Sequence, residues 1–180
     1  MPTDAELLDL EDSIATKLAV APSGAQVGFS EAMQERIDDL ADLLAVGINE
    51  GALVQMEQGI RHVFTPHLYT RELSLPRGSI VVTAIHQTEH PYVVSKGVVR
   101  VFIEGVGWET IRAPYIGVTK PMTRRVALIV EDCVWTTFHV TEKKDPDEVL
   151  AEIAVPTYWA LKEELQCQSH QSQPESSGLA

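Results

Sequence analysis

The sequence predicts a mainly β protein, a sandwich or barrel with helical segments at both ends of the chain. Three observations predict this class. Short runs rich in Val, Ile and aromatic residues alternate with polar residues between positions 63 and 141. Gly and Pro separate these runs without intervening helical patterns, which argues against repeated βαβ units. Residues with helical spacing lie before and after this region.

The strand pattern starts at Val63 and continues through Leu68–Leu75, Ser79–Ile85, Tyr92–Ser95, Val98–Ile103, Trp108–Ala113, Val126–Val130 and Cys133–Thr141. We expect turns at Glu104–Gly107, at Glu131–Asp132 and at Ser95–Gly97, with a positive φ at Gly97. The chain then divides into a helical N-terminal segment (1–60), a β-barrel (61–142), C-terminal helices (143–166) and a polar tail (167–180).

Two amphipathic helices are predicted before the strands. Residues 4–19 carry Leu and Ile at helical spacing, with acidic residues in the first turns. Ser30 is a favourable N-cap for a second helix. We expect this second helix to reach about Val46 and to end at Gly47.

A short helical segment is predicted after the strands. Asp145 and Pro146 have the cap and first-turn chemistry of a helix that reaches about Ala154. Pro156 then begins a second short amphipathic piece. The residues after it are mostly Gln, Ser, Pro and Gly, a composition that does not fold alone.

The composition argues against several classes of partner. The 180 residues carry a net charge of −12, whereas nucleic acids and anionic membranes require clustered Lys and Arg, so we expect neither partner. Cys133 and Cys167 lie in unrelated contexts and predict no disulfide framework. The acidic N-terminus lacks an apolar core, and no apolar run is long enough to span a bilayer. We expect a soluble protein made in a cytoplasm.

The stretch from Gly78 to Gly97 resembles the first motif of the cupin family, a jelly-roll barrel also called a double-stranded β-helix. Both glycines stand at the family's spacing. His86 occupies the place of one metal ligand, whereas Ala84 occupies the place of another His and His90 the place of a Glu. The resemblance implies a cupin-like jelly-roll in which the usual ligand set is incomplete.

The second cupin motif is weaker. Its best match is 121–123, which lacks the usual glycine and puts Val126 at the place of the ligand His. His139 is a candidate replacement, because strand alternation puts it on one face with Cys133, Trp135, Thr137 and Thr141. The same alternation puts Ile80, Val82, Ala84 and His86 on one face.

His86, His90 and His139 are therefore the candidate metal ligands, provided that both faces look into the barrel. Three neutral imidazoles with an open position suit a divalent transition metal. The alternative is that no cofactor is bound and each histidine hydrogen-bonds or packs inside the barrel. The pattern favours this alternative, and no catalytic residue is assigned.

Other polar and aromatic residues are weaker candidates. Arg124 and Arg125 are interpreted as a solvated loop pair, with an anion clamp as the alternative. Trp108 and Trp135 are interpreted as core aromatics rather than ligand platforms. His62 and His67 flank the first strand and are expected to be exposed, and His170 lies in the polar tail.

Part of the chain, from about Arg71 to Glu152, is also similar to small cupin-like proteins carried in tailed-phage genomes. The similarity lies in REL-x-LP-x-G at 71–78, IHQTEH at 85–90 and VWTTFHVTEK at 134–143. It implies a non-enzymatic structural protein of a virion (tail, adaptor, fibre or decoration), forming a homo-oligomer and contacting other structural proteins. The alternative is a metal-dependent cupin enzyme, or a protein that binds a sugar or organic acid through the three histidines.

Overall fold

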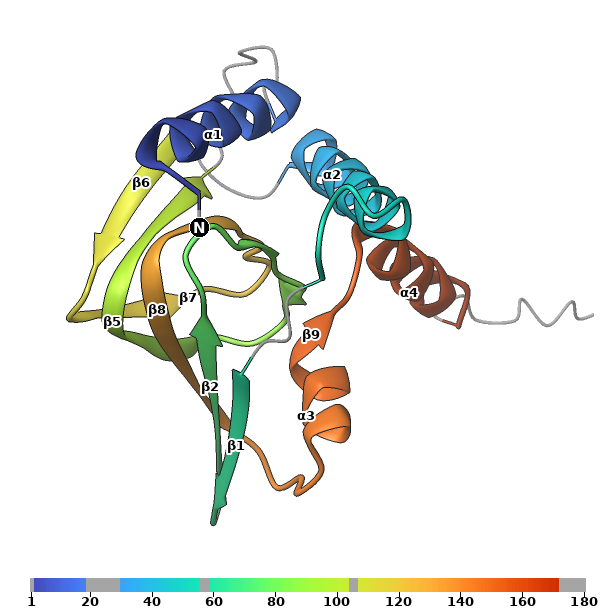
Figure 1. Cartoon of the computed structure of the whole chain (residues 1–180). Helices are drawn as coiled ribbons and strands as arrows, with labels where there is room; N and C mark the ends of the chain where they lie inside the picture. The colour runs from blue at the N-terminus through green and yellow to red at the C-terminus, as the bar shows by residue number, and fades with distance from the viewer. Residues whose placement is uncertain (1, 19–29, 56–58, 104–106, 172–180) are drawn as a thin grey trace, which may run out of the picture.

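The computed structural model describes residues 2–18, 30–55, 59–103 and 107–171, with side chains as far as Cys167 (Figure 1). The elements are α1 (Asp4–Leu18), α2 (Glu31–Asn49), β1 (Gly59–Thr65), β2 (Leu68–Leu75), β3 (Ile80–Val82), β4 (Ile85–His86), β5 (His90–Ile103), β6 (Gly107–Arg112), β7 (Tyr115–Thr119), β8 (Val126–Val140), α3 (Pro146–Ile153), β9 (Ala154–Val155) and α4 (Tyr158–Gln171). The predicted class, mainly β with N-terminal helices and a short C-terminal helical segment, is confirmed.

One antiparallel sheet forms most of the molecule. Its strands follow the order β1-β2-β8-β5-β6, while β3 pairs with β8 and β7 pairs with β5. A separate two-stranded sheet joins β4 to β9. The main sheet curves around an interior whose core includes Val94, Val99, Val101, Ile129 and Cys133. The sequence did not predict β7 or β9, because β7 is a short exposed strand after Pro114 and β9 has two residues.

The two longest strands, β5 and β8, pass through the turns expected at Ser95–Gly97 and Glu131–Asp132, so both turn predictions are wrong. The strands pair with one another there, with register shifts between Val94 and Val99. Gly97 has the predicted positive φ, at +87°. Residues typical of turns therefore make a bulge that bends two paired strands together instead of ending them.

We predict that Gly97→Ala is more destabilising than Gly51→Ala. Both glycines have a positive φ, but a Cβ at Gly97 would lie 2.3 Å from the carbonyl oxygen of Asp132, whereas nothing lies within 4 Å of one at Gly51. The close approach should cost about 1–3 kcal/mol beyond the shared backbone strain. Urea denaturation of both variants measures the difference, and equal losses would contradict the packing of Gly97 against β8.

The other predicted turn, Glu104–Gly107, includes residues 104–106, which lie outside the described residues. The antiparallel pairing of Ile103 with Gly107 nevertheless joins β5 to β6 as a hairpin.

The helices α1 and α2 cover the outer face of the sheet (Figure 1). Helix α1 has the predicted bounds to within a residue, and the Met33 N–H donates to the Ser30 hydroxyl at the N-cap of α2. Helix α2 continues through Gly47 to Asn49, so its predicted end was wrong. No helix in the described ranges is both long and apolar enough to cross a membrane.

Apolar contacts join these helices to the sheet. The cluster between them contains Ile14, Leu18, Met33, Ile37, Leu40 and Val126, with Ile80, Val82 and Phe102 packed against it. Val81, next to Ile80, packs in the barrel interior instead. The chain leaves the sheet between β3 and β4, so alternation does not carry across that gap. Of the four residues predicted to share a face, Val82, Ala84 and His86 line the barrel interior, whereas Ile80 packs under the helices, so the prediction is wrong for Ile80.

A buried ion pair between Asp38 and Arg124 connects α2 to the barrel. Asp38 Oδ1 lies 2.5 Å from Arg124 Nη1, and the two side chains are 3% and 2% exposed. Arg124 Nε donates to the carbonyl of Thr83, and Asp38 Oδ2 accepts the N–H of Tyr158 at the start of α4. One carboxylate and one guanidinium thus join three segments that are distant in sequence.

The C-terminal segment crosses the open side of the barrel (Figure 1). Asp145 caps α3 by accepting the N–H groups of Asp147 and Glu148, as its sequence context predicted. Val149 and Ile153 pack against Tyr69 of β2. Helix α4 runs to Gln171, so helical structure continues into the segment predicted as polar tail, and 172–180 lie outside the described residues.

We predict that Asp38→Ala lowers the free energy of unfolding by about 3–5 kcal/mol, because it leaves the Arg124 guanidinium buried without its partner. The exposed neighbour Asp39 provides a matched control on the same helix. Asp39→Ala should change the unfolding free energy by no more than about 0.5 kcal/mol. Comparable losses for both variants in chemical denaturation would contradict the role of the pair.

Candidate functional site

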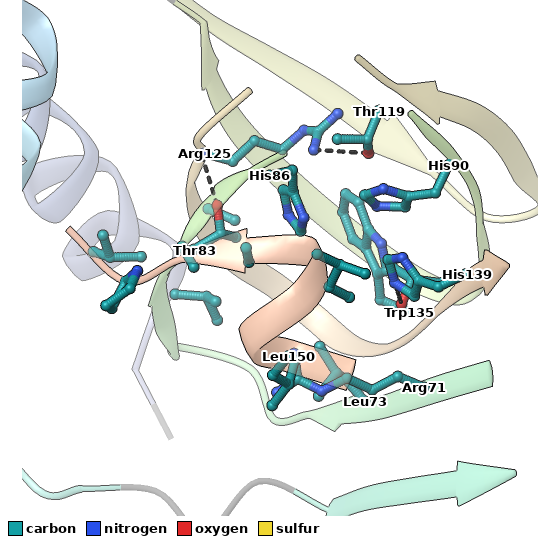
Figure 2. A pocket seen from close by; sticks show the side chains of 18 of the residues that line it. Arg71, Leu73, Thr83, His86, His90, Thr119, Arg125, Trp135, His139 and Leu150 are labelled. Atoms are coloured by element: carbon teal, nitrogen blue, oxygen red, sulfur yellow. Dashed lines mark hydrogen bonds between the residues drawn. The ribbon is translucent and has the colours of Figure 1, made fainter. Parts of the chain in front are cut away.

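The barrel encloses a cavity of about 470 Å³ (Figure 2). Strands β2, β3, β5, β7 and β8 supply most of its wall, and α3 and β9 cover one side. Its lining combines apolar side chains with a polar group that comprises Arg71, Thr83, His86, His90, Thr119, Arg125, Thr137 and His139. A cavity of this size, mostly apolar with a few convergent polar groups, is typical of a small-molecule site.

The cavity brings together all three histidines that the sequence singled out. The ring centroids of His86 and His90 are 4.7 Å apart, and those of His90 and His139 are 4.2 Å apart. Strand register explains the second approach: Tyr92 pairs with Thr137, so His90 and His139 come next to each other on neighbouring antiparallel strands. His86 reaches the group from β4, which Thr123 and β9 hold in place.

Each histidine keeps one buried ring nitrogen without a hydrogen-bond partner among the described residues: Nδ1 of His86, Nε2 of His90 and Nδ1 of His139. The other nitrogen of His90, Nδ1, donates to the carbonyl of Thr88 at 3.1 Å. This bond leaves Nε2 of a neutral His90 as an acceptor. His139 Nε2 lies 3.0 Å from the hydroxyl of Thr137. The cluster therefore has unused hydrogen-bonding capacity inside the cavity wall.

All three rings are neutral at physiological pH. The pKa values of His86 and His139 are lowered to about 3, chiefly by burial and in smaller part by repulsion from His90 and from the charge of Arg71. Burial also lowers the pKa of His90, against the opposing effect of its bond to Thr88. Neutral imidazoles can accept as well as donate hydrogen bonds.

Two arginines, Arg71 and Arg125, face the same cavity. From the sequence, an anion clamp at Arg124 and Arg125 was only the alternative interpretation, and Arg71 was not a candidate. Arg125 donates to the hydroxyl of Thr119 at 3.0 Å and lies over the ring of Tyr92. Arg71 comes from β2, on the other side of the histidines (Figure 2). The predicted solvated pair at Arg124 and Arg125 is wrong, because Arg124 is buried against Asp38 and Arg125 lines the cavity.

The remaining sequence predictions for the site have mixed outcomes. Ala84 lines the cavity at the place where the cupin frame has a histidine. Val126, at the corresponding place of the second motif, packs under the helices instead. Trp135 stacks on Tyr92 in the core and also lines the cavity. His62 and His67 are exposed, as predicted.

A metal ion does not fit this arrangement as it stands. In the described part of the chain, no group of three or more His, Cys, Asp or Glu side chains is placed to hold one. The cavity lining includes two guanidinium groups and no carboxylate, which disfavours an added cation. We therefore derive no chemistry through a metal, and metal binding at His86, His90 and His139 stays a prediction.

Comparison with known proteins gives structural likeness at the level of the fold. No family model and no curated protein matches the chain. One similar solved structure is a cupin-2 domain protein from Shewanella frigidimarina, which is 12% identical over 52% of this chain and 90% of its own, with a TM-score of 0.40. Another is an RmlC-like cupin with a double-stranded β-helix from Methanocaldococcus jannaschii, which is 12% identical over 53% of this chain and 88% of its own, with a TM-score of 0.41. KdgF from Halomonas sp. is 20% identical over 53% of this chain and 90% of its own (TM-score 0.40). The argument for the site therefore rests on this chain's own residues.

We predict that the buried histidines make the protein less stable as pH falls from about 6.5 toward 3. Unfolded histidines take up protons near pH 6.5, whereas His86 and His139 in the folded chain resist protonation until about pH 3. Folding stability should therefore be complete above pH 6.5 and fall below it, by at most about 1.4 kcal/mol per pH unit for each histidine.

His139→Gln should reduce this slope, as measured by urea denaturation between pH 7 and pH 4.5. The reference is the unsubstituted chain under the same conditions. A His139→Gln slope equal to that of the unsubstituted chain would show that His139 is not held neutral by burial.

Proposed function

We propose that the chain is a small-molecule-binding protein whose ligand lies in the barrel cavity against His86, His90 and His139. The observation that carries this proposal is a cavity of about 470 Å³ whose mostly apolar lining holds one group of polar side chains, with the three neutral histidines at its centre. A molecule with polar and apolar parts fits such a lining, because it makes hydrogen bonds to the polar group and buries its apolar part against the remaining wall.

The cavity supports binding more strongly than it supports a named reaction. The histidines are neutral, and a neutral imidazole is able to act as a base. A reaction also needs a positioned partner group, such as a nucleophile or an acidic residue, and among the described residues no Asp or Glu lines the cavity. The proposal is therefore binding without an assigned chemical step.

Metal binding by the three histidines stays the alternative that the sequence left open, although the described residues are not placed as a metal-binding group. One feature is compatible with it: Nδ1 of His90 donates to the carbonyl of Thr88, as the second nitrogen of a ligating histidine typically does. Metal analysis of the purified chain beside His86→Ala tests it. Near-stoichiometric metal in the unsubstituted chain that is lost in His86→Ala would support metal binding. The absence of metal from both proteins would contradict it.

The test of binding is a thermal shift measurement with monosaccharides, amino acids, carboxylic acids and the amides of those acids. A ligand at 100 times its Kd adds about 2.7 kcal/mol to stability and should raise Tm by several degrees. Ala84→Phe fills the cavity at a lining position and should abolish the shift. Ala32→Phe, at an exposed position on α2, should retain it.

Two results would contradict the binding proposal. In the first, no compound raises Tm for the unsubstituted chain. In the second, Ala84→Phe remains folded and responds to the same compounds to the same degree, which would place binding outside the cavity.

The structural role predicted from the sequence stays a prediction. In that role the chain forms a homo-oligomer and is a structural component of a tailed-phage virion. No observation on the described residues favours it over a binding role. Sedimentation velocity at micromolar concentration tests the oligomer: a stable homo-oligomer would support it, and a monomer would count against it.

A further inference from the structure

We propose that the ligand of the cavity is an organic acid, a carboxylate with an apolar body, which Arg71 and Arg125 select by charge. This inference rests on the proposed binding function and narrows the class of ligand. It is drawn from the charges around the cavity rather than from the histidines.

The cavity is cationic inside an acidic protein. The chain contains 26 Asp and Glu residues against 14 Lys and Arg, yet the residues that line the cavity include two arginines and no carboxylate. Because the histidines are neutral, the arginines carry the formal charges of the lining. A buried positive charge without an opposite charge is costly, and an anionic ligand removes that cost.

Neither arginine of the cavity pairs with a carboxylate among the described residues, in contrast to several other arginines of the chain. Ion pairs join Arg61 to Glu72, Arg77 to Asp4, Arg100 to Glu11 and Arg124 to Asp38. Arg125 has a hydroxyl and an aromatic ring as its partners instead. The Nε atom of Arg71 is buried without a partner in the described part of the chain. Both guanidinium groups are thus available to an acceptor.

The two arginines flank the histidine cluster. Figure 2 shows the rings of His86, His90 and His139 between Arg125 on one side and Arg71 on the other. Burial is the main cause that lowers the pKa values of the three histidines. Arg125 adds to this effect at His86 and His90, and Arg71 adds to it at His86 and His139. A carboxylate placed against the cluster therefore meets a guanidinium and an imidazole nitrogen together.

The rest of the lining indicates the other part of the ligand. Leu73, Val81, Ile129, Trp135 and Leu150 supply an apolar wall next to the polar group. Burying an apolar body against such a wall is favourable, at about 25 cal/mol per Å². Inorganic anions make no use of this wall, so the combination favours an organic acid over phosphate or sulfate.

The test is calorimetric titration of the full chain with matched acids and amides. The probes are 3-phenylpropionate beside 3-phenylpropanamide, and hexanoate beside hexanamide. Each pair has nearly the same shape and differs in charge, so the acid should bind at least ten-fold more tightly than its amide. Inorganic phosphate, the charged probe without an apolar body, should bind more weakly than either acid.

Variants assign the effect to the arginines. Arg71→Gln and Arg125→Gln should each weaken acid binding ten-fold or more and leave amide binding nearly unchanged. Arg112→Gln, at an exposed position on β6, is the control and should bind both probes like the unsubstituted chain. If a cavity variant does not fold, the comparison of acid with amide binding to the unsubstituted chain still tests whether the cavity selects an organic acid.

The outcomes separate this inference from the binding proposal. If amides or monosaccharides bind as tightly as acids, or if phosphate matches the acids, the inference is wrong while the binding proposal stands. If none of the probes in either experiment binds, the binding proposal itself fails. Acid binding that Arg71→Gln and Arg125→Gln leave intact would overturn the assignment to these arginines.

Discussion

The buried ion pair between Asp38 and Arg124 is the interaction on which the shape of the cavity depends. Arg124 donates to the carbonyl of Thr83, and Thr83 lines the cavity. Arg125 follows Arg124 directly, and its backbone exchanges hydrogen bonds with Thr83. Asp38 also accepts the N–H of Tyr158, just after the segment that covers the open side of the barrel. The pair thus holds α2, α4 and two stretches of cavity wall in one arrangement.

This constraint explains how one end of the barrel remains a cavity while the other end is solid core. Where Cys133, Ile129 and Val99 meet, side chains from the curved sheet fill the interior. At the end near His86, the wall is completed by the C-terminal segment, which Asp38 and the short β4–β9 sheet position. Space remains between these two ends, lined in part by polar side chains. The end near His86 also holds Arg71 and Arg125, which pair with no carboxylate among the residues that the structure describes.

The pattern of short strands and turns predicted the fold class, and the resemblance to the cupin motif singled out His86 and His90. Period-two alternation in β8 put His139 and Thr137 on one face, which the fold turns to the interior. Local patterns failed where long-range pairing decided the structure. Turn-type residues at Gly97 and Asp132 became a bulge, because the two strands pair across them.

The charge of the site was not predictable from local pattern. Arg71 looks like an exposed residue of an alternating strand, and Arg124 and Arg125 look alike in the sequence. In the fold, Arg124 pairs with the buried carboxylate of Asp38, whereas Arg125 lines the cavity. Two adjacent arginines before an apolar strand are therefore ambiguous in a sequence. Their roles become clear only when it is known what packs on each face of that strand.

The most direct test of the central claim, that this cavity is an organic-acid site, is a crystal structure of the chain grown with 3-phenylpropionate. The account predicts the acid inside the barrel, with a carboxylate oxygen within hydrogen-bond distance of Arg71 or Arg125 and the ring against the apolar wall. A cavity that holds only ordered water, with the acid absent or bound at the surface, would contradict it.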